Sequence, residues 1–242
     1  MTDMELFQSG RLQEAIPALG AEVRDHPLDI KRRTFLFELL CFAGEYDRAA
    51  KHLDILGDAS PAAKMGSLVY QCAIQAEKTR QTMFVDHSYP PPKAGATRSG
   101  TRNGISFNSF SDTDERFAGH LEVFVAGSYV WITLEQISSI EIPAPKRLRD
   151  LLWTPAIVRP TPAYRAMELG EVLLPVLSPL SWKHEDDSVK LGRSTVWDEN
   201  SNSGAVPFGQ KTFLIDEQEI PILELGKIEF SAIAGEIRAV SA

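Results

Sequence analysis

A segment near the amino-terminus of this chain is written twice, with the second copy 34 residues after the first. The first copy, GRLQEAIPALGAEVRDHP, covers residues 10–27, and the second, GEYDRAAKHLDILGDASP, covers residues 44–61. The two copies share glycine, alanine, leucine and proline at matching places, in the pairs Gly10/Gly44, Ala15/Ala49, Leu19/Leu53 and Pro27/Pro61. A fixed period in the range of roughly 20 to 50 residues is the signature of stacked repeats.

Each shared residue has a physical role in a pair of helices. Glycine permits the tight turn after a helix, small alanine lets two helices approach closely, leucine fills the seam, and proline stops the second helix. A period of 34 residues is that of the tetratricopeptide helix pair. Two unrelated amphipathic helices would give the same pattern by chance, and this alternative stays open at this point.

Apolar spacing predicts helices throughout the first 85 residues. Leu12, Ala15, Ile16, Leu19 and Val23 follow one helix face, although Pro17 is expected to kink that helix. A second helix is predicted over residues 29–44 and a capping helix over residues 62–84. We therefore expect a tetratricopeptide-like helical domain over residues 1–85. In such a stack the first helix of each pair lines a concave side, which predicts a partner-binding groove lined by Thr34, Glu38, Cys41, Leu68 and Gln75. The alternative is that these side chains pack against the rest of the chain.

The composition changes over residues 86–104, DHSYPPPKAGATRSGTRNG, where prolines, glycines and hydroxyl side chains dominate. Such a segment does not build a core, and it predicts a solvated linker. Beyond it the apolar pattern is that of strands, with a hairpin signal at Ala126-Gly127-Ser128. Long crossover helices are missing from the pattern. The expected carboxy-terminal part is therefore a mostly antiparallel α+β domain over residues 105–242, which makes the whole an α + β two-part chain.

Charge and motifs narrow the function. The net charge of −8 argues against a nucleic-acid partner, and the apolar runs are too short to span a membrane. We expect a cytoplasmic protein with two reduced thiols, Cys41 and Cys72. Motifs for catalysis, metal or cofactor binding are not seen, so we expect no enzyme, no catalytic residue and no cofactor. Two clusters combine arginine and tryptophan, and they suit a second recognition surface or an internal framework bridged to Asp150: Arg147, Arg149, Asp150, Trp153, Arg193 and Trp197.

Several separated motifs occur in a characteristic order along the chain: LFQSGRLQEAI, RTFLFELLCFAGEYDRA, YVWITLEQI, LRDLLW, GEVLLPVL and LGRSTVW. Together they resemble the ImpE/TagJ family of type VI secretion accessory proteins. One departure lies at residues 177–181, where the family usually reads close to LYPGS and this chain reads LSPLS.

The resemblance implies a non-enzymatic cytoplasmic adaptor. Its expected partner is the amino-terminal helix of the small sheath subunit, TssB, which gives an indirect link to sheath recycling by the ClpV unfoldase. A general peptide-binding scaffold, or an enzyme with a site in the carboxy-terminal domain, remains the alternative.

Overall fold

The computed structural model describes residues 2–93, 97–166, 169–199 and 204–232. The chain forms two compact units, and the path of the chain passes between them more than once. The first unit consists of Met1–Ser88, Leu177–Trp197 and Phe208–Gln210. The second consists of Tyr89–Val176, Asp198–Pro207 and Lys211–Ala242. Part of the carboxy-terminal half of the sequence therefore belongs to the helical unit.

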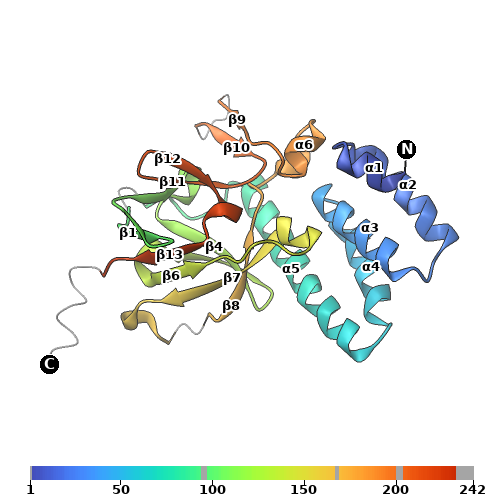
Figure 1. Ribbon diagram of the computed structural model, residues 1–242, viewed down its shortest axis with the longest axis horizontal. Helices are drawn as coiled ribbons and strands as arrows, with labels where there is room; N and C mark the ends of the chain where they lie inside the picture. Colours follow the sequence, from blue (N-terminus) through green and yellow to red (C-terminus); the bar gives the residue numbers. More distant parts are fainter. Residues whose placement is uncertain (1, 94–96, 167–168, 200–203, 233–242) are drawn as a thin grey trace. The chain divides into compact units, whose positions relative to one another are not determined.

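The first unit is built from successive helices, as the apolar spacing predicts (Figure 1). They are α1 (Asp3–Gln8), α2 (Leu12–Asp25), α3 (Ile30–Phe42), α4 (Tyr46–Gly57), α5 (Pro61–Val85) and the short α6 (Asp187–Lys190). Side-chain caps fix the starts of α3 and α5, because Asp29 accepts from the Arg32 N–H and Ser60 from the Ala63 N–H. The predicted fold class, helical first and antiparallel sheet second, is confirmed.

Equivalent positions of the two copies have equivalent environments. Gly10 and Gly44 both have left-handed backbone, with φ of 79° and 73°, and Ala15 and Ala49 are both fully buried. Proline differs from its expected role. Pro61 is the first residue of α5 rather than the stop of α4, which ends at Gly57, because a proline at the first helical position loses no hydrogen bond. Pro17 lies inside α2, which continues to Asp25.

The second unit contains an eight-stranded antiparallel sheet in the order β2-β1-β13-β6-β7-β8-β4-β5. A three-stranded sheet, β12-β11-β3, belongs to the same unit, and β9 and β10 form a separate pair. The strands are β1 (Gly100–Arg102), β2 (Ile105–Phe107), β3 (Phe110–Asp112), β4 (His120–Val125), β5 (Ser128–Thr133), β6 (Ile137–Glu141), β7 (Trp153–Pro160), β8 (Glu171–Pro175), β9 (Val196–Asp198), β10 (Val206–Phe208), β11 (Thr212–Ile215), β12 (Gln218–Pro221) and β13 (Lys227–Phe230).

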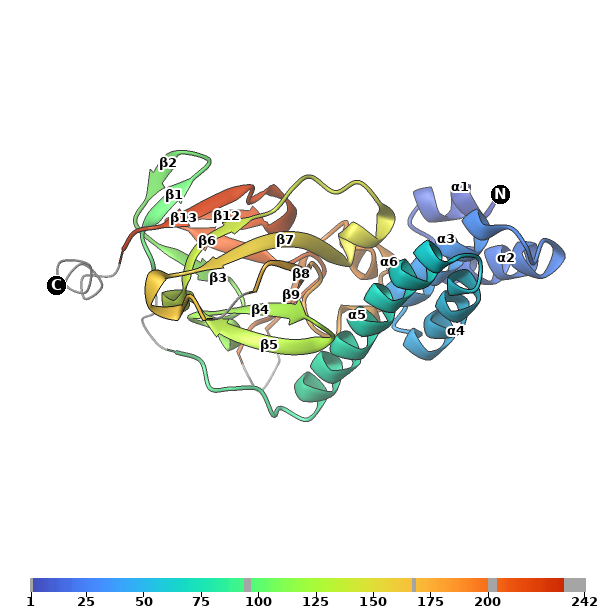
Figure 2. The same ribbon diagram turned by 90° about the horizontal axis from the view of Figure 1, so that it is seen from below.

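The predicted hairpin is β4–β5, whose strands lie side by side in Figure 2. Its turn residues Ala126 and Gly127 both have positive φ, as a two-residue primed turn requires. An apolar core lies between the two sheets of this unit and includes Phe110, Ile137, Ile140 and Ile228.

Part of the segment expected to be a solvated linker belongs to the sheet. β1 falls within residues 86–104, and Arg98 is buried there. The Arg98 guanidinium donates to the carbonyls of Leu134 and Ser231, both at 2.6 Å. Residues 94–96 of that segment lie outside the described residues. Composition alone predicts a linker because Arg98 is polar. The carbonyls that bind it, at Leu134 and Ser231, lie far along the chain and give no local signal.

Candidate partner-binding site

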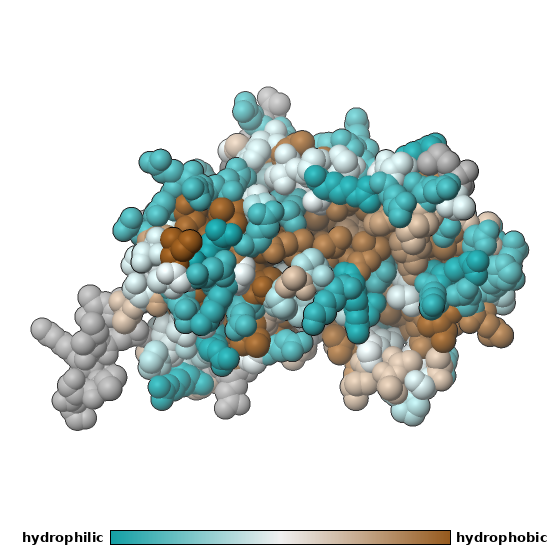
Figure 3. All heavy atoms as spheres, viewed as in Figure 1, coloured by the Kyte–Doolittle hydropathy of each residue, from teal (hydrophilic) through white to brown (hydrophobic). Residues whose placement is uncertain are grey.

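The amino-terminal half of α5 exposes an apolar stripe. Met65, Leu68 and Val69 have exposed fractions of 66%, 56% and 48%, and the half-buried Cys72 follows one turn later. The spacing i, i+3, i+4, i+7 places these four side chains on one face of the helix. Apolar side chains are visible among polar ones on the surface of the molecule in Figure 3.

The other side of α5 is held on α4 by hydrogen bonds to main-chain carbonyls. The Ser67 hydroxyl donates to the Leu53 carbonyl at 2.7 Å, and the Gln71 amide donates to the Ala50 carbonyl at 3.0 Å. With these contacts in place, the stripe lies on the exposed side of α5.

The five residues predicted for a groove divide into two groups. Leu68 and Gln75 are exposed on α5, and Thr34 is half-buried on α3. Glu38 and Cys41, also on α3, are buried, with exposed fractions of 6% and 1%. The expectation that Glu38 and Cys41 face an incoming ligand is therefore corrected, because α3 is a central helix of the unit and is covered on most sides.

A buried polar cluster lies on α5, near Cys41 of α3. Arg80 Nη1 donates to Glu77 Oε1 at 3.0 Å, and the Gln81 side-chain amide donates to the same carboxylate. Burial raises the pKa of the Cys41 thiol well above its usual value, and the nearby Glu77 and Glu38 raise it further. Cys41 is thus held as a neutral thiol, which makes it a poor nucleophile.

The segment Leu177–Trp197, here called the strap, lies on these helices within the first unit. Arg80 Nη2 donates to the Leu177 carbonyl at 2.9 Å. Gln81 Oε1 accepts from the Leu180 N–H at 2.9 Å and from the Trp182 indole N–H at 3.1 Å. Arg80 and Gln81 of α5 therefore bind residues 177–182 by hydrogen bonds.

The strap continues to the first helix pair. The Arg193 guanidinium donates to the carbonyls of Gln8 and Phe7 at 2.9 and 2.8 Å, and it lies 4.9 Å from the centre of the Phe7 ring. Asp187 accepts from the Gln13 N–H at 2.8 Å, which caps the start of α2. The sequence signal for these contacts is weak, because they join residues more than 170 positions apart.

The arginine–tryptophan residues belong to different units. In the second unit, Asp150 is buried and accepts from the N–H groups of Lys146 and Arg147 at 2.8 and 2.9 Å. The other residues of this cluster differ in burial: Arg147 is exposed, Arg149 is half-buried and Trp153 is 1% exposed. In the first unit, Arg193 binds α1 and Trp197 is 39% exposed.

The second unit contains a buried charge cluster that no sequence motif predicts. Lys211 Nζ lies 2.9 Å from Asp112 Oδ2 and 2.6 Å from Glu122 Oε1, and all three side chains are almost inaccessible. The ammonium also lies 3.6 Å from the centre of the Phe117 ring. Burial raises the pKa of Asp112 to about 6, although the adjacent Lys211 opposes this effect.

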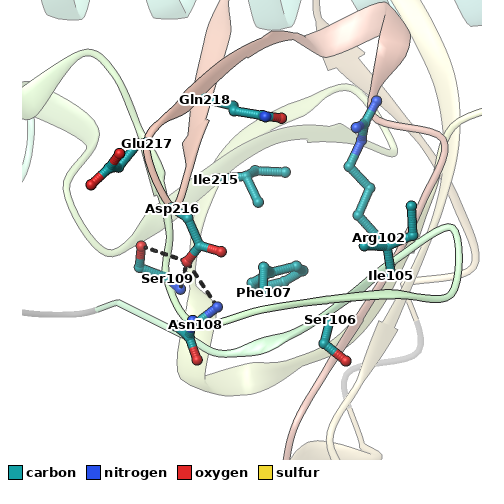
Figure 4. A pocket seen from close by; sticks show the side chains of 10 residues that line it. All are labelled: Arg102, Ile105, Ser106, Phe107, Asn108, Ser109, Ile215, Asp216, Glu217 and Gln218. Atoms are coloured by element: carbon teal, nitrogen blue, oxygen red, sulfur yellow. Dashed lines mark hydrogen bonds between the residues drawn. The ribbon is translucent and has the colours of Figure 1, made fainter.

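An open depression of about 730 Å³ lies at the edge of the eight-stranded sheet (Figure 4). Its lining comes from β1, β2 and the β11–β12 turn and includes Arg102, Phe107, Ile215 and Gln218. Asp216 Oδ1 accepts from the N–H groups of Asn108 and Ser109 at 2.8 and 2.9 Å, which fixes the turn against the connection between β2 and β3. The walls of the depression carry charges of both signs, from Arg102 on one side and from Asp216 and Glu217 on the other.

Within the described part of the chain, no three or more histidine, cysteine or acidic side chains are grouped so as to hold a metal ion. Over the same residues, none of the helices combines the length and apolar composition that crossing a bilayer requires.

Comparison with known proteins places these features in a family. The family model described as "ImpE protein" matches residues 104–229. The type VI secretion system accessory component TagJ of Pseudomonas aeruginosa is 30% identical, over 93% of this chain and 90% of TagJ. A crystal structure of a Vibrio parahaemolyticus protein has a TM-score of 0.82 at 21% identity and covers 97% of this chain and 99% of that one. The last likeness concerns the fold alone.

Proposed function

Because this chain belongs to the ImpE family, we propose that it is a non-enzymatic accessory component of a bacterial type VI secretion system. Its proposed task is to bind the amino-terminal helix of the small sheath subunit in the cytoplasm. Through that subunit it would be connected to sheath recycling by the ClpV unfoldase. The likeness to TagJ supports the accessory role, and the surface of α5 supports capture of a helix.

The observation that carries the proposal is the exposed apolar stripe Met65, Leu68, Val69 and Cys72. An amphipathic helix binds by laying its own apolar stripe against such a face, with anchors spaced by three and four residues. Methionine suits this use because its flexible thioether adapts to the shape of a ligand. A stripe of two helical turns buries a modest area, so we expect an affinity of about 1 µM or weaker.

The buried position of Glu38 changes how the site is probed. A rim carboxylate would steer a basic ligand, but the Glu38 side chain is only 6% exposed. Replacing it with lysine would bury a cation at this position and lower the stability of the unit. Exposed residues of α5 are therefore the informative ones.

The test is a titration of a labelled peptide with the sequence of the sheath-subunit helix against purified protein. Leu68→Asp is expected to weaken binding at least tenfold, because it desolvates a carboxylate against the apolar face of the ligand. The matched control is Ile105→Asp on β2, where an isoleucine with an exposed fraction of 76% stands in the other unit. Thermal unfolding of both variants verifies that they remain folded.

Unchanged affinity in a folded Leu68→Asp variant would remove the site from α5. Loss of affinity in both variants would indicate non-specific hydrophobic binding and would contradict the proposal equally. Weaker binding in Leu68→Asp alone supports it. A scrambled peptide of the same composition controls for the charge of the ligand.

A further inference from the structure

We propose that the buried side chains of Lys211 and Asp112 in the second unit condense with each other to form a covalent amide bond. The reaction needs no ligand and is independent of the proposed sheath partner. The structure describes the cluster before this reaction, as an ion pair. The effects of its charges and of pH on stability belong to this unlinked form.

The reacting groups are held in contact by the fold. Lys211 Nζ lies 2.9 Å from Asp112 Oδ2, and the two side chains are only 2% and 3% exposed. Asp112 is the last residue of β3, and Lys211 directly precedes β11, the neighbouring strand of the three-stranded sheet. Two groups held together in this way react as if at a very high concentration.

Burial favours the uncharged forms that the reaction requires. An amine and a carboxylic acid can condense, whereas an ammonium has no free electron pair and a carboxylate resists attack. Transfer of one proton from Lys211 to Asp112 gives the neutral pair, which a site without water favours. Burial raises the pKa of Asp112 to about 6, in the same direction. The rings of Phe117 and Phe213, whose centres lie 3.6 and 6.0 Å from Nζ, add to the apolar surroundings.

Glu122 is placed to carry a proton during the reaction. Its Oε1 lies 2.6 Å from Lys211 Nζ, and its Oε2 accepts from the Tyr129 hydroxyl at 2.9 Å. This hydrogen bond favours the ionised form of Glu122, which can accept a proton. Asp112 Oδ1 accepts from the Asp114 N–H at 3.0 Å. That N–H therefore lies where negative charge develops when Cγ of Asp112 is attacked.

The reaction releases one water molecule. The electron pair of Lys211 Nζ attacks Cγ of the protonated Asp112, the N–C bond forms, and negative charge moves to Oδ1. Glu122 takes a proton from Nζ and passes it to the Oδ2 hydroxyl. The bond between Cγ and Oδ2 then breaks, water leaves, and the C=O double bond returns at Oδ1. The product is a side-chain amide between β3 and β11, and no oxidant or reductant is consumed.

The mass of the intact chain tests the proposal. Wild-type protein incubated for several days at neutral pH should lose the mass of one water molecule per chain. Digestion followed by tandem mass spectrometry should then give a branched peptide in which Lys211 is joined to Asp112. The exposed pair Lys227 and Glu229, which is similarly close at 2.8 Å, is the internal control and should give no branched peptide.

Two variants test the roles of the residues. Lys211→Arg keeps a cation at this position, but its guanidinium stays protonated and is no nucleophile, so this variant should keep its full mass. Glu122→Gln should slow the loss of water at least tenfold, because an amide does not carry the proton. Thermal unfolding verifies that both variants are folded.

The proposal is overturned if the wild type still has the full mass calculated from its sequence after the incubation. It is also overturned if folded Lys211→Arg loses water as the wild type does, because the loss would then arise elsewhere in the chain. An unchanged rate in folded Glu122→Gln would contradict the transfer of the proton through Glu122.

Discussion

The indole ring of Trp182 lies directly on Gly44. A Cβ atom at position 44 would stand 2.5 Å from Trp182 Cδ2 and 2.7 Å from Trp182 Cγ. The same glycine has a φ of 73°. Gly44 therefore has two roles. It provides the left-handed turn between α3 and α4, and it leaves space for the Trp182 ring of the strap.

Gly44→Ala is expected to destabilise the protein by about 3 kcal/mol, from left-handed strain and overpacking against Trp182 combined. The measurement is urea unfolding at neutral pH. Adding Trp182→Ala should recover the overpacking part, so that the double variant costs less than the sum of the single ones. The control is Gly66→Ala on α5, which meets no atom within 4 Å. It should be neutral or stabilising by about 0.5 kcal/mol. Strict additivity of the first two changes would show that the ring and the alanine do not compete.

Arg193→Ala should cost about 1–2 kcal/mol, because it removes two hydrogen bonds to α1 carbonyls and the contact with the Phe7 ring. Arg193→Lys should recover little of this, since an ammonium does not reproduce the two-pronged donation of a guanidinium. Arg24→Ala, at an exposed position of α2, serves as the control and should change stability by less than about 0.5 kcal/mol. Full rescue by lysine would contradict the geometric argument.

Local signals predict most of the helices and several strands of this fold. The glycine and alanine pairs at 34-residue spacing mark the turns and buried contacts of the helices, and Ala126-Gly127 marks the β4–β5 turn. These features depend on neighbours in the sequence. Contacts between residues far apart along the chain have no such local signal. They include those of the strap, of the buried Arg98 and of the Lys211 cluster. Glu38 is an opposite case. A charged residue in an amphipathic helix is expected at the surface, but the Glu38 side chain is buried.

The exposed stripe on α5 was only partly predictable. The repeat pattern predicts Leu68 and Gln75 on a concave side with Glu38, but helix periodicity does not show which of two apolar faces the rest of the chain covers. The contacts of Ser67 and Gln71 with α4 decide this, and they leave Leu68 outside.

Lys211→Met should destabilise the second unit by about 3–5 kcal/mol, because Asp112 and Glu122 would then face each other in a buried site without a cation. Combining it with Asp112→Asn and Glu122→Gln should restore part of the loss, because the amides carry no charge. Lys227→Met removes an exposed pair with Glu229 and should cost less than about 1 kcal/mol. Unfolding followed by tryptophan fluorescence measures all three. A small effect of Lys211→Met would mean that water reaches the cluster.

The pH dependence of stability should report on Asp112. Its pKa is about 6 in the folded protein, mainly because of burial, against an ordinary value of 3.8. The folded state therefore binds a proton more tightly than the unfolded state does. Stability should fall as the pH rises from about 4 to about 6 and then level off, with a contribution of at most about 3 kcal/mol from this group.

Asp112→Asn removes that titration. Asparagine retains an oxygen for the hydrogen bond from the Asp114 N–H, which the aspartate accepts at 3.0 Å. The difference in unfolding free energy between wild type and variant should therefore change between pH 4 and pH 6 and stay constant from pH 7 to 8. Urea unfolding at half-unit pH steps measures it, and Asp216→Asn, at an exposed turn, is the control. Parallel curves for wild type and Asp112→Asn across the acidic range would show that Asp112 keeps an ordinary pKa, because Lys211 then compensates the burial in full.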